Sequence, residues 1–111
     1  MDTRKLKVVV SDHYTDDLKN IFRYGLETFG YNEALSFYNN IERLVANLDA
    51  EYNMYPECRF LVRKGKIYRN IILESYLIIY RITPDRIEVL RAFHSSICNS
   101  SRIRSVRNIK I

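Results

Sequence analysis

The hydrophobic period of this chain changes once, and that change constrains its fold more than any other feature. From Tyr14 to about Ala50 the apolar residues recur at spacings of three and four, which is the period of amphipathic helices. From Ile67 to Phe93, short runs rich in Ile, Leu, Val and Tyr are separated by turn-like residues, which is typical of strands. We therefore predict an α+β fold in which a helical segment precedes most of the strands.

The helical part divides into two helices. Ser11 and Asp12 are candidate N-caps, because their side-chain oxygens can accept hydrogen bonds from the amides of a first turn. The apolar face of the first helix consists of Leu18, Ile21, Phe22, Gly25 and Phe29. Gly30 suits the turn that ends this helix, and Asn32 is a candidate cap for a second helix that runs to about Ala50. A connection of two or three residues makes the pair an antiparallel hairpin.

The strands are expected on both sides of this hairpin. Leu6–Val10 is rich in β-branched residues and predicts an N-terminal strand. Four further candidates follow the hairpin, at Arg59–Arg63, Ile67–Leu73, Tyr76–Ile82 and Arg86–Phe93. Their short connections predict an antiparallel meander of three to four strands, with the helical hairpin covering one face.

A length of 111 residues suits one domain, 1–111. Its last part, about 98–111, is a basic tail in which Ile103, Val106 and Ile109 recur every three residues, which predicts a short helix or a basic arm. No apolar run approaches the ~18 residues of a membrane span, and the N-terminus does not read as a secretory signal. We therefore expect a cytoplasmic protein with no membrane partner.

Charge is divided unequally along the chain. Residues 1–58 carry 6 Lys/Arg and 10 Asp/Glu, a net charge of −4, whereas residues 59–111 carry 12 and 3, a net charge of +9. A basic face built from the second half would attract nucleic acid or an acidic protein segment. The alternative is ordinary solubilising charge.

Standard catalytic and cofactor motifs are absent from the sequence. Cys58 and Cys98 match no metal spacing, so we expect reduced, inert thiols, no metal and no cofactor. Arg69, Arg81 and Arg91 lie in successive predicted strands and would form a cationic surface if they share a face of the sheet; the alternative is a solvated face.

Two strand sequences carry a family resemblance. Ser75–Ile82 reads Ser-Tyr-Leu-Ile-Ile-Tyr-Arg-Ile, and Ile87–His94 reads Ile-Glu-Val-Leu-Arg-Ala-Phe-His. They follow a Val-Val-Val-Ser strand end at residues 8–11 and a helical hairpin that contains Phe29-Gly30. In this order, from about residue 6 to 103, these segments resemble the ParE branch of the RelE/ParE toxin superfamily.

The resemblance implies a toxin of a type II toxin–antitoxin system, of the kind also called plasmid stabilisation proteins. Each such toxin is neutralised by a small antitoxin whose C-terminal segment wraps over the helical hairpin and sheet. ParE-type members inhibit DNA gyrase and block replication, whereas RelE-type members cleave messenger RNA in the ribosome. On this basis the expected partner-binding residues are Arg69, Arg81, Arg91, Arg102, Arg104 and Arg107. The basic second half of the chain predicts that the antitoxin is acidic.

The RelE-like alternative requires a general base, a general acid and cations around the scissile phosphate. Leu77 stands where the RelE pattern has an arginine, and His94 is the only basic residue just after the last strand. The ParE branch is therefore favoured, and an inactive, decayed toxin stays open. If the nuclease alternative holds, its catalytic residues would be His94, Arg81, Arg91 and Tyr80.

Overall fold

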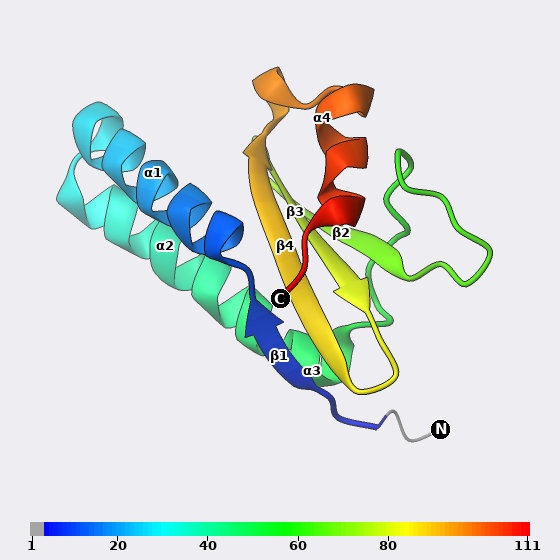
Figure 1. Cartoon of the computed structure of the whole chain (residues 1–111). Coiled ribbons are helices and arrows are strands. Elements are labelled where there is room, and N and C mark those ends of the chain that lie inside the picture. Colours follow the sequence, from blue (N-terminus) through cyan, green and yellow to red (C-terminus); the bar gives the residue numbers. More distant parts are fainter. Residues whose placement is uncertain (1–3) are drawn as a thin grey trace.

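The computed structural model describes residues 4–111 and has three layers (Figure 1). A helical hairpin covers one face of a four-stranded sheet, and the C-terminal segment lies against the other face. The elements in chain order are β1 (Lys7–Val10), α1 (Asp12–Phe29), α2 (Tyr31–Ala46), α3 (Leu48–Glu51), β2 (Tyr68–Leu73), β3 (Tyr76–Ile82), β4 (Arg86–His94), η1 (Ser95–Ile97), α4 (Ser100–Arg104) and η2 (Ser105–Asn108). The predicted α+β class is confirmed.

The sheet has the strand order β1-β4-β3-β2. β2, β3 and β4 form the predicted antiparallel meander, whereas β1 lies at the edge and pairs in parallel with β4. A register shift pairs Ile79 with Arg91 and Tyr80 with Val89, so Leu90 is the extra residue of a bulge in β4.

The hairpin begins and turns where the local chemistry requires it. The Ser11 hydroxyl accepts a hydrogen bond from the Tyr14 amide at 2.9 Å and donates one to the Leu90 carbonyl at 2.6 Å, which caps α1 and ties it to β4. Gly30 alone connects α1 and α2, with φ 91° and ψ 173°, a backbone conformation almost restricted to glycine. At Gly25 an added Cβ would lie 3.1 Å from the Ala34 Cβ, so the two helices approach each other closely at this point.

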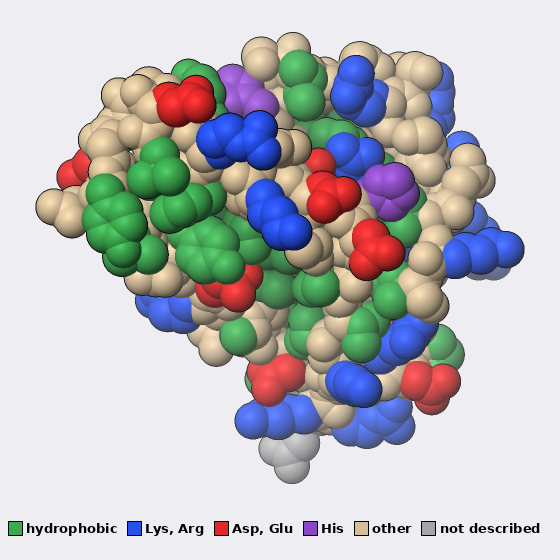
Figure 2. Space-filling view, turned by 60° about the vertical axis from the view of Figure 1, so that its left-hand side comes forward, with side chains coloured by type: hydrophobic (Ala, Val, Ile, Leu, Met, Phe, Trp, Pro, Cys, Tyr) green, Lys and Arg blue, Asp and Glu red, His purple; other side chains and the backbone are tan. Residues whose placement is uncertain are grey.

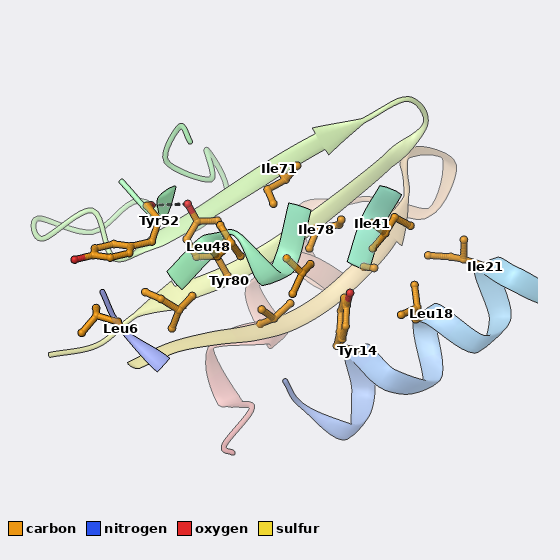
Figure 3. Close-up of a cluster of buried hydrophobic side chains, with 14 residues drawn as sticks. Leu6, Tyr14, Leu18, Ile21, Ile41, Leu48, Tyr52, Ile71, Ile78 and Tyr80 are labelled. Carbon is orange, nitrogen blue, oxygen red and sulfur yellow. Dashed lines mark hydrogen bonds between the residues drawn. The ribbon is translucent and has the colours of Figure 1, made fainter. Parts of the chain in front are cut away.

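Two hydrophobic clusters pack on opposite faces of the sheet. The first joins the hairpin to the sheet and includes Leu18, Ile41, Leu48, Ile78 and Tyr80 (Figure 3). The second joins the other face to the C-terminal segment and to the loop that precedes β2. Its members are Cys58, Leu61, Tyr68, Ile79, Leu90, Phe93, Ile103 and Val106.

Several sequence predictions of local structure are corrected. Residues 59–63 form turns instead of a strand, because Cys58 and Leu61 are both buried, a spacing of three that no single strand face offers. The second helix ends at Ala46 and a separate turn of helix, α3, follows at Leu48–Glu51. Asn32 lies within the first turn of α2 instead of capping it.

The basic tail is ordered against the sheet. Ile103 and Val106 are fully buried and Ile109 packs against the same cluster, so the predicted short helix is confirmed and the free basic arm is not. No helix in the described part of the chain has the length and hydropathy needed to cross a membrane.

Candidate functional site: the hairpin groove and the C-terminal basic face

A hollow of about 840 Å³ lies between the outer half of the hairpin and the end of the sheet. We name it the hairpin groove. α1 contributes Tyr24 and Phe29, α2 contributes Phe37, and the sheet contributes Tyr76 and His94. Its polar lining comes from Glu33, Ser36, Asn39, Asn40, Arg43, Glu74 and Ser75. The wall combines five aromatic side chains with seven polar ones, a mixture typical of a surface that binds a protein segment.

Three aromatic side chains stack along the base of the groove. The ring centroids of Phe37 and Tyr76 are 5.5 Å apart, and those of Tyr76 and His94 are 5.1 Å apart with the rings nearly perpendicular. The His94 Nδ1 lies 3.1 Å from the Ser96 amide and accepts its hydrogen bond, which fixes the orientation of the ring. Burial raises the pKa of Tyr76, and the neighbouring Tyr24 adds to this effect, so its hydroxyl stays neutral at physiological pH.

The tip of the hairpin exposes large aromatic side chains. Tyr24, Phe29 and Tyr31 are 53%, 65% and 62% exposed. Their exposure follows from length: the 18 residues of α1 span roughly 27 Å, at ~1.5 Å per residue, and the last turns extend beyond the sheet (Figure 1). Figure 2 shows hydrophobic side chains gathered over this hairpin face. The periodicity of the sequence predicts that Phe29 lies on the buried face of α1, and this is wrong. Periodicity shows which residues share a helix face, but it does not show how far the sheet extends beneath that face.

Arg69 faces the hairpin side of the sheet. It pairs with Tyr80 across β2 and β3, and its guanidinium donates to the carbonyls of Asn53 and Tyr55 at 3.0 Å and of Lys66 at 3.1 Å. These three bonds fasten the loop between α3 and β2. Arg69 therefore has a structural role in the chain, since its Nε and Nη1 groups are bound to this loop.

Arg81 points to the opposite face, because it pairs with Tyr68 and neighbouring residues of a strand alternate between faces. Its Nε donates to the Glu88 Oε1 at 2.7 Å, and Arg86 donates to the Glu88 Oε2 at 2.9 Å. The same two arginines donate to the carbonyls of Ile109 and Ile111, each at 2.9 Å. A buried Glu88 thus orients two arginines that hold the C-terminal segment on the sheet.

Arg91 belongs to a third environment. It forms a two-bond ion pair with Asp17 of α1, with Nε–Oδ2 and Nη2–Oδ1 distances of 2.7 and 2.9 Å. The same carboxylate also accepts from the Ala92 amide at 2.9 Å. The hypothesis that Arg69, Arg81 and Arg91 form one cationic face is therefore wrong, since three different sets of partners surround them.

The residues proposed for a nuclease also lie apart. Tyr80 is fully buried, donates to the Tyr52 carbonyl at 2.6 Å (Figure 3) and has its pKa raised by burial, so it does not reach a substrate. His94 pairs with Tyr76 and Arg81 with Glu88, at opposite ends of β3. The two positions are five residues apart along the strand, roughly 17 Å at ~3.3 Å per residue. His94, Arg81, Arg91 and Tyr80 do not converge on one phosphate.

The exposed cations gather elsewhere. Arg102, Arg104 and Arg107 of the predicted partner-binding set are exposed on α4 and η2. The second hydrophobic cluster packs this segment against the loop 57–67, which exposes four more cations, Arg59, Arg63, Lys64 and Lys66. We name this combined surface, with Lys110, the C-terminal basic face. The sequence shows its charge but not its assembly, because the loop and the tail are far apart along the chain.

Neither cysteine has the environment of a nucleophile. Both thiols are free, and burial raises the pKa of both Cys58 and Cys98. A raised pKa leaves little thiolate at neutral pH. Within residues 4–111, no group of three or more His, Cys, Asp or Glu side chains is placed to hold a metal ion.

Comparison with known proteins gives one family match. Residues 8–97 match the family model described as the ParE toxin of the type II toxin–antitoxin system parDE. Ten chains of solved structures match the fold; one, from the chromosomal ParDE toxin–antitoxin system of P. aeruginosa, has a TM-score of 0.68 and 20% sequence identity. That match covers 83% of this chain and 98% of the other. No curated protein matches the sequence.

Proposed function

Because the chain belongs to the ParE toxin family of type II toxin–antitoxin systems, we propose that it inhibits DNA gyrase and is neutralised by an antitoxin that binds the hairpin groove. The family match over residues 8–97 is the observation that carries this proposal. The chain acts in the cytoplasm, where it would meet both partners.

The hairpin groove supports the antitoxin part of the proposal. An antitoxin segment that folds on binding needs apolar anchor sites to offset the entropy it loses. Phe29 and Tyr24 of the groove are exposed aromatic residues of the kind that dominates the binding energy of protein interfaces. The partner is expected to be the product of a short neighbouring gene, with an acidic C-terminal half that complements the net positive charge of this chain.

A substitution in the groove tests this assignment. Phe29→Ser should weaken binding of the neighbouring gene's product at least tenfold, because it removes an aromatic side chain that the partner would bury. Calorimetry measures the affinity. Met54→Ser, which changes an exposed apolar residue outside the groove, should leave the affinity unchanged. Equal affinities for both variants would place the antitoxin elsewhere.

The gyrase part is supported by the family and by the separation of the four residues proposed for a nuclease. Adding the purified chain to gyrase and supercoiled plasmid should produce linear DNA after detergent and protease treatment. The product should disappear when the antitoxin is added first. Supercoiling that proceeds without linear DNA would count against the proposal.

The RelE-like alternative, cleavage of messenger RNA in the ribosome, has one favourable observation: His94 lies at the groove with its ring held in place. Primer extension on messenger RNA after expression separates the two functions. Site-specific cuts that vanish in His94→Ala would favour the nuclease, and an unchanged transcript pattern would favour gyrase inhibition.

A further inference from the structure

We propose that the C-terminal basic face binds the phosphate backbone of duplex DNA without reading its sequence. This inference rests on the proposed function and deepens it. It names the ligand that the exposed cations contact while the chain acts on gyrase. DNA binding itself is a property of the chain alone. It is therefore measurable whether or not gyrase is the target.

The C-terminal basic face is a built surface and not a flexible arm. Ile103 and Val106 of the C-terminal segment share a fully buried cluster with Cys58 and Leu61 of the loop. Arg81 and Arg86 fix the end of the segment through the carbonyls of Ile109 and Ile111. Two sequence segments are thus held side by side, and their cations keep fixed relative positions. A preorganised surface loses less entropy when it binds a regular polyanion.

The charge of this surface is of one sign. Residues 57–67 and 99–111 contain eight cations and one acid. The cations are Arg59, Arg63, Lys64, Lys66, Arg102, Arg104, Arg107 and Lys110, and all eight are exposed. Within residues 4–111 none of them forms an ion pair, whereas Arg81, Arg86 and Arg91 of the sheet are all paired. The single acid, Glu57, accepts a hydrogen bond from the Arg63 amide.

The shape of the surface favours nucleic acid over an acidic peptide. A folding peptide needs apolar hollows, and hollows of about 840 and 400 Å³ lie along the helical hairpin, on the other side of the sheet. Val62 and Ile111 are the large apolar side chains that the loop and tail expose. Exposed Ser101, Ser105 and Asn108 are each next to an arginine in the sequence and suit phosphate oxygens.

The side chains of the C-terminal basic face suit contacts with DNA phosphates and not recognition of bases. Five of the eight cations are arginines, whose planar fork of donors matches a phosphate. The loop and tail expose no aromatic side chain for base stacking within the described residues; Phe60 is half-buried and lies under the Arg59 guanidinium, 4.8 Å from its ring centroid. Such a surface binds by counterion release, which depends strongly on salt and not on sequence.

The test uses fluorescence anisotropy of the full chain with a labelled duplex of ~30 base pairs, in two unrelated sequences and over a series of salt concentrations. The variant R102Q/R104Q/R107Q should bind both duplexes about tenfold or more weakly, and the slope of log affinity against log salt should decrease by about 3. The matched control K19Q/R23Q/R43Q removes the same number of charges from the exposed hairpin and should lose less than threefold. Thermal unfolding checks that both variants fold.

Three outcomes would overturn the proposal. The first is no binding of either duplex at ~0.1 M salt, and the second is an equal loss in both triple variants, which would reflect net charge alone. In the third, a glutamate 20-mer binds more tightly than the duplex and loses affinity in R102Q/R104Q/R107Q, which would identify an acidic protein segment as the ligand. A failure of gyrase inhibition with intact DNA binding would reject the target and keep this inference.

Discussion

At the scale of single residues, Glu88 takes part in two of the four ion pairs of the described residues. Its side chain is 8% exposed, that of Arg81 is 14% exposed, and Arg86 completes the group. Burial alone would raise the pKa of Glu88, but hydrogen bonds and charge from Arg81 and Arg86 outweigh burial and hold its pKa below the ordinary value of about 4.5. One buried carboxylate therefore keeps two arginines in position for the C-terminal segment.

Glu88→Gln should lower the free energy of unfolding by about 3 kcal/mol, because it leaves two partly buried guanidinium groups without their counter-charge. Urea unfolding followed by circular dichroism measures this. Glu27→Gln removes an exposed charge from α1 and should change stability by less than ~0.5 kcal/mol. Equal effects of the two substitutions would show that the ionic group contributes little.

The same group makes a prediction about pH. A carboxylate whose pKa is lowered by folding contributes stability that is complete above its unfolded pKa and is lost as pH falls through the folded value. The free energy of unfolding should therefore decrease as pH falls below about 4.5. This decrease should be smaller in Glu88→Gln, and an identical pH profile in both proteins would contradict the lowered pKa.

At the scale of elements, the turn between α1 and α2 sets the geometry of the hairpin groove. Gly30 is the one residue between the two helices, and its φ of 91° lies where other residues are strained. An added Cβ meets nothing within 4 Å, so the cost of a substitution is that of the backbone alone. The turn beside the groove therefore depends on the backbone freedom of this glycine and not on space for a side chain.

Gly30→Ala should destabilise the fold by about 1–3 kcal/mol, as expected for a residue forced into this backbone region. Gly65→Ala is the matched control, because its Cβ would make only an ordinary 3.4 Å contact and its φ is not in the strained region. Thermal unfolding compares the two. A Gly30→Ala protein as stable as Gly65→Ala would mean that the turn accommodates a side chain.

The C-terminal segment is a structural element of the fold, and Ile103→Ala tests this. Removing its fully buried side chain should cost about 2–4 kcal/mol and increase amide exchange in residues 99–109, because the segment is held to the sheet mainly by this cluster. The more exposed Ile111→Ala should cost under ~1 kcal/mol. If Ile103→Ala matched Ile111→Ala, the segment would be an independent arm.

The elements were predictable where a local signal specifies them, and the functional surfaces were not. Periodicity, the Ser11 cap and the turn residues locate the hairpin and the meander. Arg69 and Arg81 show why the functional surfaces could not be predicted. A shift of one residue in strand pairing moves each side chain to the other face of the sheet, and no local sequence signal reports this register. The assembly of the loop 57–67 with the tail likewise depends on long-range packing.

At the scale of the whole molecule, the two outer layers have opposite charge. The helical layer, residues 12–51, contains 8 acids and 3 Lys/Arg, whereas the C-terminal basic face contains eight cations and one acid. The layers lie on opposite sides of the sheet (Figure 1). Duplex DNA should therefore approach the basic side, and this leaves the hairpin groove on the other side open to a second partner that binds through apolar anchors.

We propose that this ParE-family chain stops replication and not translation. The most direct measurement is pulse-labelling of bacterial cells with thymidine and methionine in the minutes after the chain is induced. We predict that thymidine incorporation falls first, while methionine incorporation continues, and that coexpression of the neighbouring antitoxin gene restores it. Methionine incorporation that stops while thymidine incorporation continues would contradict the account.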